Sequence, residues 1–364
     1  MASTYKTFVN NDVATTKTLL HEAIPLTGTI VSGTYYIVES ETQTNIKRYS
    51  HGMFESVYDY PYLSSSANHI FDLTCGFSAQ SHLSKSAADK GQAKKISIYN
   101  QMAQVLVGYD ATGSIRRFDR DGDFTTNAEG NKGAKIDEAF FINYARLLTK
   151  DEVKKNSFRL KLYTHSAGGA RGSALATFGD YLAGTSYKTN SPAGEYAILY
   201  TGSGTPNEDG SSGKGLIYYQ AGIAVMTASI FTGVFAPNTT VNGTGNPRRF
   251  SSVDACLTGS LITGSCEAFR NRWDDCDFNN TTELNSTVYF CRANHNEFNY
   301  SANPTYVSSS KIRVKNRSID EPVSYITGIG LYSPDNELLA VAKVSEPLKK
   351  APSTELTLRV RLDY

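Results

Sequence analysis

The sequence has almost no charge imbalance. It carries 36 Lys and Arg residues against 35 Asp and Glu residues, a formal net charge of +1 over 364 residues. Proteins that bind nucleic acids usually carry a clustered excess of basic residues. We therefore expect no nucleic acid among the partners of this protein.

The chain also lacks the usual signals for export or membrane insertion. The first residues, Met1 to Lys6, are not followed by an apolar core segment, so we expect no signal peptide and folding in a reducing cytoplasm. The uncharged stretch 215–247 is long enough to span a bilayer. However, Gln220 and several glycines and hydroxyl residues interrupt it, and no basic cluster flanks it. We interpret it as two buried strands that break at Gly222, with a transmembrane helix or a loop buried only in an assembly as alternatives.

Recognised catalytic motifs are missing. There is no Gly-x-Ser-x-Gly segment, and the six histidines never show His-x-x-x-His spacing. His165 and Ser166 are adjacent, but neighbours on a strand point to opposite faces. The glycine-rich stretch 210–215 lacks the first glycine of a phosphate loop, and Gly215 stands where Ser or Thr should follow Lys214. We predict that the protein is not an enzyme and has no catalytic, cofactor-binding or metal-binding residues; a carboxylate pair scattered in the sequence is the open alternative.

One acidic segment, Asp119-Arg120-Asp121-Gly122-Asp123, resembles the start of a calcium loop. Alternating carboxylates around a glycine supply the oxygen ligands that calcium prefers. Phe124 stands where such a loop needs glycine, and Gly130 stands where it needs glutamate. We favour a solvated turn, and the pattern does not decide whether Asp119, Asp121 and Asp123 bind an ion.

Cysteine is scarce, and four of the five residues fall in one region. Cys256, Cys266, Cys276 and Cys291 are separated by 10, 10 and 15 positions, a poor match to zinc sites, which pair cysteines two to four residues apart. Three disulfide pairings are conceivable, and the spacing does not choose among them. We favour buried free thiols that behave as small apolar side chains.

Apolar periodicity predicts an α+β fold that is predominantly β, with antiparallel sheets, two or three helices between about 90 and 155, and long polar loops. The composition agrees, because 23 tyrosines and 29 glycines favour strands and loops over helices. The individual expectations are a strand pair at 28–40, helices at 90–108 and about 136–148, a strand at 157–163, and loops over 165–215.

The C-terminal region has the most regular pattern of the chain. Residues 356–364 alternate apolar and polar side chains, which is typical of a strand with one buried face. Residues 326–333 and 338–345 predict two further strands around a turn at Pro334-Asp335-Asn336.

These segments suggest three parts. Residues 1–28 are expected to form an extended N-terminal arm that pairs with another chain or lies as a first strand on its own domain. Residues 29–200 would form a core domain with the helices, completed by a C-terminal sheet at 301–364. Residues 201–300 would form a loop-rich insertion or second subdomain.

Four segments resemble virion structural proteins of marine, T4-like contractile-tailed phages: Pro322–Ser333, Asp335–Leu348, Leu216–Gly222 and His295–Tyr300. The resemblance implies a structural subunit of the virion, assembled in the host cytoplasm, and a place in the tail baseplate or wedge. Its partners would be other tail subunits and copies of itself. The resemblance brings no catalytic residue and no cofactor.

Other functions are compatible with the same residues. The protein could be a structural component of the neck or head vertex. It could also bind a host receptor or carbohydrate, because tyrosine-rich β proteins often stack on sugars. A virion-borne hydrolase is the third alternative.

Overall fold

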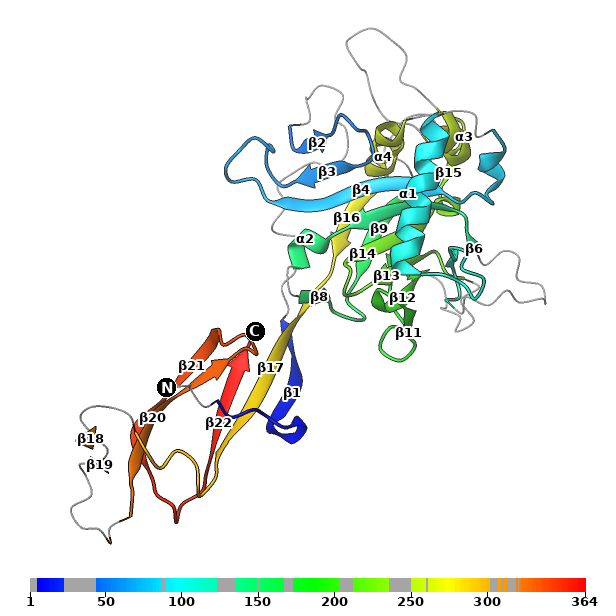
Figure 1. Ribbon diagram of the computed structural model, residues 1–364. Coiled ribbons are helices and arrows are strands. Elements are labelled where there is room, and N and C mark those ends of the chain that lie inside the picture. Colours follow the sequence, from blue (N-terminus) through cyan, green and yellow to red (C-terminus); the bar gives the residue numbers. More distant parts are fainter. Residues whose placement is uncertain are drawn as a thin grey trace. The chain divides into compact units, whose positions relative to one another are not determined.

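The computed structural model describes residues 5–22, 44–86, 90–122, 135–148, 151–166, 173–202, 212–235, 250–259, 261–301, 307–308, 311–312, 319 and 321–364. The chain divides into two compact units. Unit 1 comprises Met1–Leu19 and Glu283–Tyr364, and unit 2 comprises Leu20–Thr282. Most of the regular structure is β (Figure 1), and the sheets are largely antiparallel. The predicted α+β class with a predominance of β is therefore confirmed.

Unit 2 is built on a twelve-stranded sheet. Its main path runs β15-β9-β10-β12-β13-β14-β7-β4-β3-β2, with β11 beside β12 and β16 beside β9. Only the pairing of β15 with β9 is parallel among those described. The strands are β2 Ile46–Arg48, β3 Glu55–Tyr58, β4 His69–Phe77, β7 Glu138–Asn143, β9 Arg159–Ser166, β10 Ser173–Gly179, β11 Lys188–Ser191, β12 Gly194–Thr201, β13 Gly215–Tyr218, β14 Ile223–Thr227, β15 Thr232–Gly233 and β16 Trp273–Asp277.

Helices and short strands complete unit 2. The α-helices are α1 Lys90–Leu106, α2 Ala145–Leu148, α3 Val253–Gly259 and α4 Ile262–Asn271. Of two 3-10 turns, η2 His82–Ser86 precedes α1, and η3 Ala228–Ile230 lies between α2 and α3 in the chain. The short strands are β5 Phe118–Asp119 and β6 Lys135–Ile136, which pair with each other, and β8 Asp151–Val153, which pairs with the start of β17 (Asn280–Ala293).

Strand β7 lies in the middle of the sheet and is covered on both faces. The Phe140 ring centroid is 4.7 Å from that of Phe269 on α4, whereas Phe141 contacts Tyr99 of α1 at 6.3 Å. Because consecutive side chains of a strand point to opposite faces, α1 and α4 cover opposite faces of the sheet. The apolar core of unit 2 therefore lies in two layers around β7.

Helix α1 packs closely on β4 at Gly76. A Cβ atom at this position would lie 2.5 Å from the Lys95 carbonyl oxygen and 2.9 Å from the Tyr99 backbone nitrogen. Such distances are too short for non-bonded atoms, so only glycine allows the helix backbone to approach the strand this closely. The predicted helix at 90–108 is confirmed.

The predicted helix at 136–148 is wrong. Its residues form β7 and then the single turn α2. Ala139, Phe140, Phe141 and Ile142 are all buried, since both faces of β7 are covered. A strand buried on both faces reads as a continuous apolar run, and such a run also fits a helix.

The expected loops over 165–215 contain three strands, β10, β11 and β12. The first residues of β10 are exposed, which explains their weak apolar pattern. Two helices, α3 and α4, lie in the region expected to be loop-rich, well beyond residue 155. The strand expected at 157–163 is confirmed as β9.

In the described part of the uncharged stretch, residues 215–235, the two predicted strands around Gly222 form β13 and β14, and the short strand β15 follows. β13 and β14 pair with each other, and the turn between them contains Gly222 with φ of 63°. Among the described residues, no helix has the length and apolar character needed to cross a bilayer. The strand pair expected at 28–40 lies outside the described residues.

Unit 1 contains most of a four-stranded sheet, whose fourth strand is β8, and a two-strand ribbon. The sheet has the order β1-β17-β22, formed by Val13–Glu22, Asn280–Ala293 and Leu356–Asp363. The ribbon pairs β20 (Ser324–Tyr332) with β21 (Leu338–Lys350). The turn η1 (Asn10–Asp12) and the short pair β18 (Val307–Ser308) and β19 (Lys311–Ile312) also belong to this unit. The three C-terminal strands are confirmed.

This division differs from the one expected from the sequence. The C-terminal sheet joins the N-terminal residues in unit 1 rather than completing a domain at 29–200. Residues 213–235 contribute strands to the large sheet of unit 2 rather than forming an insertion. In the expected arm, Val13–Glu22 forms β1, which pairs with β17 of the same chain. Pairing between strands far apart in sequence leaves no local pattern, which is why the divisions differ.

Candidate functional site

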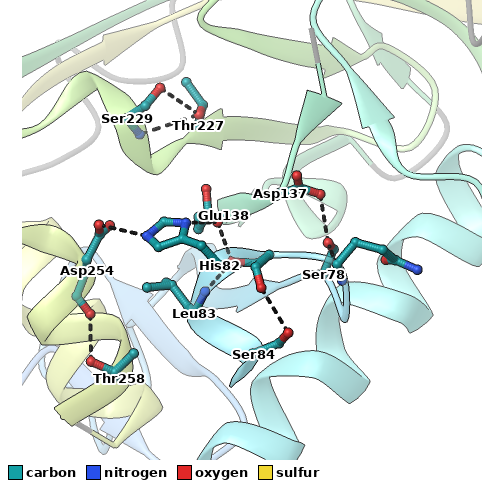
Figure 2. Close-up of polar contacts among 12 residues, drawn as sticks. Ser78, His82, Leu83, Ser84, Asp137, Glu138, Thr227, Ser229, Asp254 and Thr258 are labelled. Carbon is teal, nitrogen blue, oxygen red and sulfur yellow. Dashed lines mark hydrogen bonds and ion pairs between the residues drawn. The ribbon is translucent and has the colours of Figure 1, made fainter. Parts of the chain in front are cut away.

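His82 lies between two carboxylates, on the surface of unit 2. Its Nε2 atom is 3.0 Å from Asp254 Oδ2 of α3, and its Nδ1 atom is 3.4 Å from Glu138 Oε1 of β7. Figure 2 shows the imidazole ring between these two side chains. The His82 side chain is 63% exposed. His82 thus connects three elements, η2, β7 and α3. Among the described residues, its cluster with Glu138 and Asp254 is the polar group that most resembles a functional site.

Serine hydroxyls fix the segment that carries His82. Ser81 Oγ donates a hydrogen bond to Glu138 Oε1 and accepts one of 3.0 Å from the Leu83 backbone N–H. Ser78 Oγ donates to Asp137 Oδ1 at 2.7 Å, as Figure 2 also shows. Asp137 immediately precedes β7 and Glu138 is its first residue. These hydrogen bonds therefore hold the segment that carries His82 against the central strand of the sheet.

The geometry of His82 favours a cross-link over catalysis. A general base needs a free ring nitrogen that faces a nucleophile. Both ring nitrogens of His82 face carboxylates, and an imidazolium can donate to both of them. Within the described part of the chain, no group of three or more His, Cys, Asp or Glu side chains could hold a metal ion. The cluster therefore ties secondary-structure elements together.

The aspartate segment is not the solvated turn that was expected. Asp119 is buried and forms an ion pair with Lys135, and Asp121 is also buried. The carbonyl oxygen of Gly122 accepts a 2.9 Å hydrogen bond from the Tyr196 hydroxyl. The turn is thus packed into unit 2, and Asp123 lies outside the described residues.

The cysteines are free thiols, as favoured from the sequence. Cys256, Cys266 and Cys276 are buried and Cys291 is half-buried. Burial raises the pKa of Cys256 to about 12 and also raises that of Cys276. Because the thiolate is the nucleophile and metal ligand, these thiols are unreactive at neutral pH.

The remaining sequence candidates do not assemble into a site. His165 Nδ1 lies 3.1 Å from Thr232 Oγ1 on β15. A phosphate loop is followed by a helix, whereas Gly215 begins strand β13. Residues 210 and 211 of the glycine-rich stretch lie outside the described residues.

Exposed apolar side chains are concentrated in unit 1. Among the described residues, 21 large apolar side chains are exposed, and 13 of them belong to unit 1, although it holds under a third of the chain. These are Tyr5, Phe8, Val9, Val13, Phe298, Tyr300, Ile319, Tyr325, Tyr332, Leu338, Leu339, Val341 and Tyr364. Exposed apolar side chains mark interaction sites in soluble proteins where they form a contiguous patch.

Part of this surface forms a patch on the ribbon, which we call the ribbon patch: Tyr332, Leu338 and Val341. Tyr332 pairs with Leu338, and Gly330 pairs with Val341. A Cβ atom at Gly330 would lie 2.9 Å from the Tyr332 ring, so the ring lies back over the glycine. The Tyr5 ring centroid is 4.7 Å from that of Tyr332. The ribbon patch is therefore ordered yet exposed.

The other end of the ribbon is anchored within unit 1. Lys350 is buried, and its Nζ atom donates to Asn299 Oδ1 at 2.8 Å and to the His295 carbonyl oxygen at 3.3 Å. Ser324, which pairs with Lys350, donates to the Phe298 carbonyl oxygen. These bonds hold one end of the ribbon in place while the ribbon patch lies at the other.

No protein-family model, curated protein or solved structure matches the chain. A function must therefore be inferred from its own residues and their geometry.

Proposed function

We propose that this protein is a structural subunit of a phage virion, in the contractile-tail baseplate or wedge, and that it acts through protein–protein interfaces rather than catalysis. The observation that carries the proposal is the concentration of exposed apolar side chains on unit 1. A subunit whose role is assembly needs such a surface, whereas an enzyme needs a convergent catalytic site.

The small core of unit 1 supports an interface role. Its buried apolar side chains, among those described, are Val288, Ala293, Leu331, Ala351 and Val360. A domain of roughly 100 residues is stable when it buries most of the surface that its unfolded chain exposes. Covering an exposed Leu or Val side chain with a partner would contribute about 1.5–3 kcal/mol, so neighbours would stabilise unit 1 substantially.

The assignment to a phage tail draws on the sequence resemblance. Two of the four resembling segments, Pro322–Ser333 and Asp335–Leu348, coincide with β20 and β21. The ribbon that exposes the apolar patch thus carries two of the four segments that resemble virion proteins. A balanced charge and many tyrosines suit contacts between subunits.

Receptor or carbohydrate binding is the second candidate. Exposed tyrosines favour it, because their rings can stack on sugars while the hydroxyl bonds to them. On unit 1 these are Tyr5, Tyr300, Tyr325, Tyr332 and Tyr364. A glycan array probed with the full chain would support this candidate by specific hits, and their absence would remove it.

The main proposal can be tested on virions purified from infected cells. We expect mass spectrometry to find the chain in the particles, and gold-labelled antibody against it to mark the baseplate. Labelling at the neck would move the protein to the head-vertex alternative, and labelling at fibre tips would favour receptor binding. Absence from purified particles would overturn the virion assignment altogether.

A further inference from the structure

Two buried cysteines of unit 2 face each other between β4 and α4. Cys75 of β4 pairs with Phe140 of β7, and directly opposite residues of antiparallel strands point to the same face of a sheet. Because Phe140 contacts Phe269 of α4, Cys75 also points toward α4. Cys266 lies three residues before Phe269 on α4, and residues three apart share a face of a helix. Cys266 therefore points back toward β4.

Hydrogen bonds show that the two thiols meet. The Cys266 thiol donates to the Leu73 carbonyl oxygen of β4, with 3.4 Å between sulfur and oxygen. The side chains of Cys75 and Cys266 also hydrogen-bond to each other, and both are fully buried. Two thiols in contact need only a small side-chain rotation to reach the ~2.0 Å sulfur separation of a disulfide.

The neighbours of this pair make its two thiols unequal. The hydrogen bond with Cys266 lowers the pKa of Cys75 below its ordinary value; burial opposes this change, whereas the charge of Lys95 and the Ser265 hydroxyl reinforce it. Lys95 is itself buried beside the pair and donates to the Leu257 carbonyl oxygen. Burial raises the pKa of Cys266. Because the thiolate is the nucleophile, Cys75 is the thiol suited to attack an oxidant, and Cys266 is suited to resolve the product.

We propose that Cys75 and Cys266 are a modification site at which a peroxide forms a reversible disulfide that joins β4 to α4 covalently. The Cys75 thiolate attacks hydrogen peroxide, the O–O bond breaks, hydroxide leaves, and Cys75 becomes a sulfenic acid. The Cys266 sulfur then attacks the sulfenic sulfur, and the sulfenic oxygen leaves as water with the Cys266 proton. In total, two thiols lose two electrons and two protons, and one peroxide is reduced to two waters.

Burial of the pair selects a small oxidant. Hydrogen peroxide is scarcely larger than water, so brief local openings of the fold admit it, whereas oxidised glutathione needs a much larger opening. The inference goes beyond the proposed structural role. It concerns unit 2 alone, so it can fail while the virion assignment succeeds, and the reverse.

Thiol mapping of the unchanged, full-length chain tests the site. The reduced protein is treated with equimolar hydrogen peroxide and then unfolded in the presence of N-ethylmaleimide. We expect two of the five thiols to escape alkylation, and a non-reducing peptide digest to link Cys75 to Cys266. Oxidised glutathione at the same concentration should act at least tenfold more slowly. A disulfide between other cysteines, sulfinic acid without a disulfide, or five alkylated thiols would overturn the proposal.

Three substitutions separate the roles of the two thiols. Cys75→Ser should consume peroxide at least tenfold more slowly, and Cys266→Ser should accumulate a sulfenic acid at Cys75 that dimedone traps. The matched control is Cys276→Ser, because Cys276 is also buried but hydrogen-bonds with the Tyr144 hydroxyl instead of a thiol. It should form the disulfide at the unchanged rate. Peroxide consumption by Cys75→Ser at the full rate would overturn the proposal, and thiol mapping of the unchanged chain decides it alone if a variant does not fold.

The bond should also stabilise unit 2 reversibly. It joins segments far apart in the sequence, and such a cross-link lowers the entropy of the unfolded chain. We expect the Tm followed by Trp273 fluorescence to rise by about 5 °C or more after oxidation. Dithiothreitol should reverse the rise, because a disulfide is reducible and a sulfinic acid is not. A rise that dithiothreitol does not reverse, or none at all, would contradict a reversible link between β4 and α4.

Discussion

Units 1 and 2 differ in how they bury their apolar side chains. Unit 2 has a continuous apolar cluster from Ile46 to Phe278, with helices on both faces of its sheet. Among the described residues, unit 1 contributes none to that cluster. Most of the exposed large apolar side chains belong to unit 1. Unit 2 therefore has a large apolar core, whereas unit 1 has few buried and many exposed apolar side chains among its described residues.

The largest expected effect comes from emptying the core of unit 2. Phe140 is fully buried among Phe231, Phe235 and Phe269, so Phe140→Ala should lower the free energy of unfolding by about 3–5 kcal/mol. Urea unfolding followed by far-ultraviolet circular dichroism reports on both units, and the fluorescence of Trp273 reports on unit 2. As the matched change in unit 1, Tyr332→Ala should alter stability by under about 0.5 kcal/mol in the dilute chain. Equal effects of the two changes would remove the contrast between the units.

A pH effect of similar size is expected from Asp180 in unit 2. This buried carboxylate accepts hydrogen bonds from the Tyr219 hydroxyl at 2.7 Å and from Arg159 at 2.9 Å, yet burial raises its pKa to about 6. The folded protein then binds the proton more tightly than the unfolded chain. Its contribution to stability is complete below about pH 4 and is lost as the pH rises through 6, a change on the order of 3 kcal/mol.

Two measurements check this prediction. Carboxyl NMR should show Asp180 titrating near pH 6 in the folded protein. The loss of stability between pH 4 and 7 should be smaller in Asp180→Asn, which cannot titrate. A carboxyl that titrates at or below its ordinary value would mean that its hydrogen-bond donors outweigh burial.

The close contact between α1 and β4 predicts a smaller loss. Gly76→Ala should destabilise unit 2 by about 1–3 kcal/mol, because the new methyl group overlaps the Lys95 carbonyl oxygen. At Gly184 a Cβ atom would meet no atom within 4 Å, so Gly184→Ala is the control and should leave the urea midpoint almost unchanged. An equal shift in both variants would point to a backbone effect rather than to overlap.

The smallest effect in unit 2 is expected at His82. Because the His82 side chain is 63% exposed to solvent, His82→Ala should cost under about 1 kcal/mol. Urea unfolding measures the loss, and high salt should reduce it. A loss of several kcal/mol would show that the cross-link stabilises unit 2 far more than exposed ion pairs usually do.

The His82 cluster shows why the candidate site could not be read from the sequence. Its three members lie at positions 82, 138 and 254, and no short-range spacing relates them. Glu138 was also assigned to a helix, which would have pointed its side chain elsewhere. By contrast, the poor zinc spacing of the four cysteines was sufficient to favour free thiols.

The sequence by itself determined the elements whose pattern is local. Helix α1, the paired strands around Gly222 and the C-terminal strands follow from side-chain periodicity and from turn residues, which act over a few positions. Tertiary structure alone decided that β7 is a strand, since its apolar run fits either element until both faces are seen to be covered. It also decided that β17 pairs with β22 and that the termini share unit 1. Such choices depend on which distant segments meet when the chain collapses around its core, and side-chain periodicity carries no record of them.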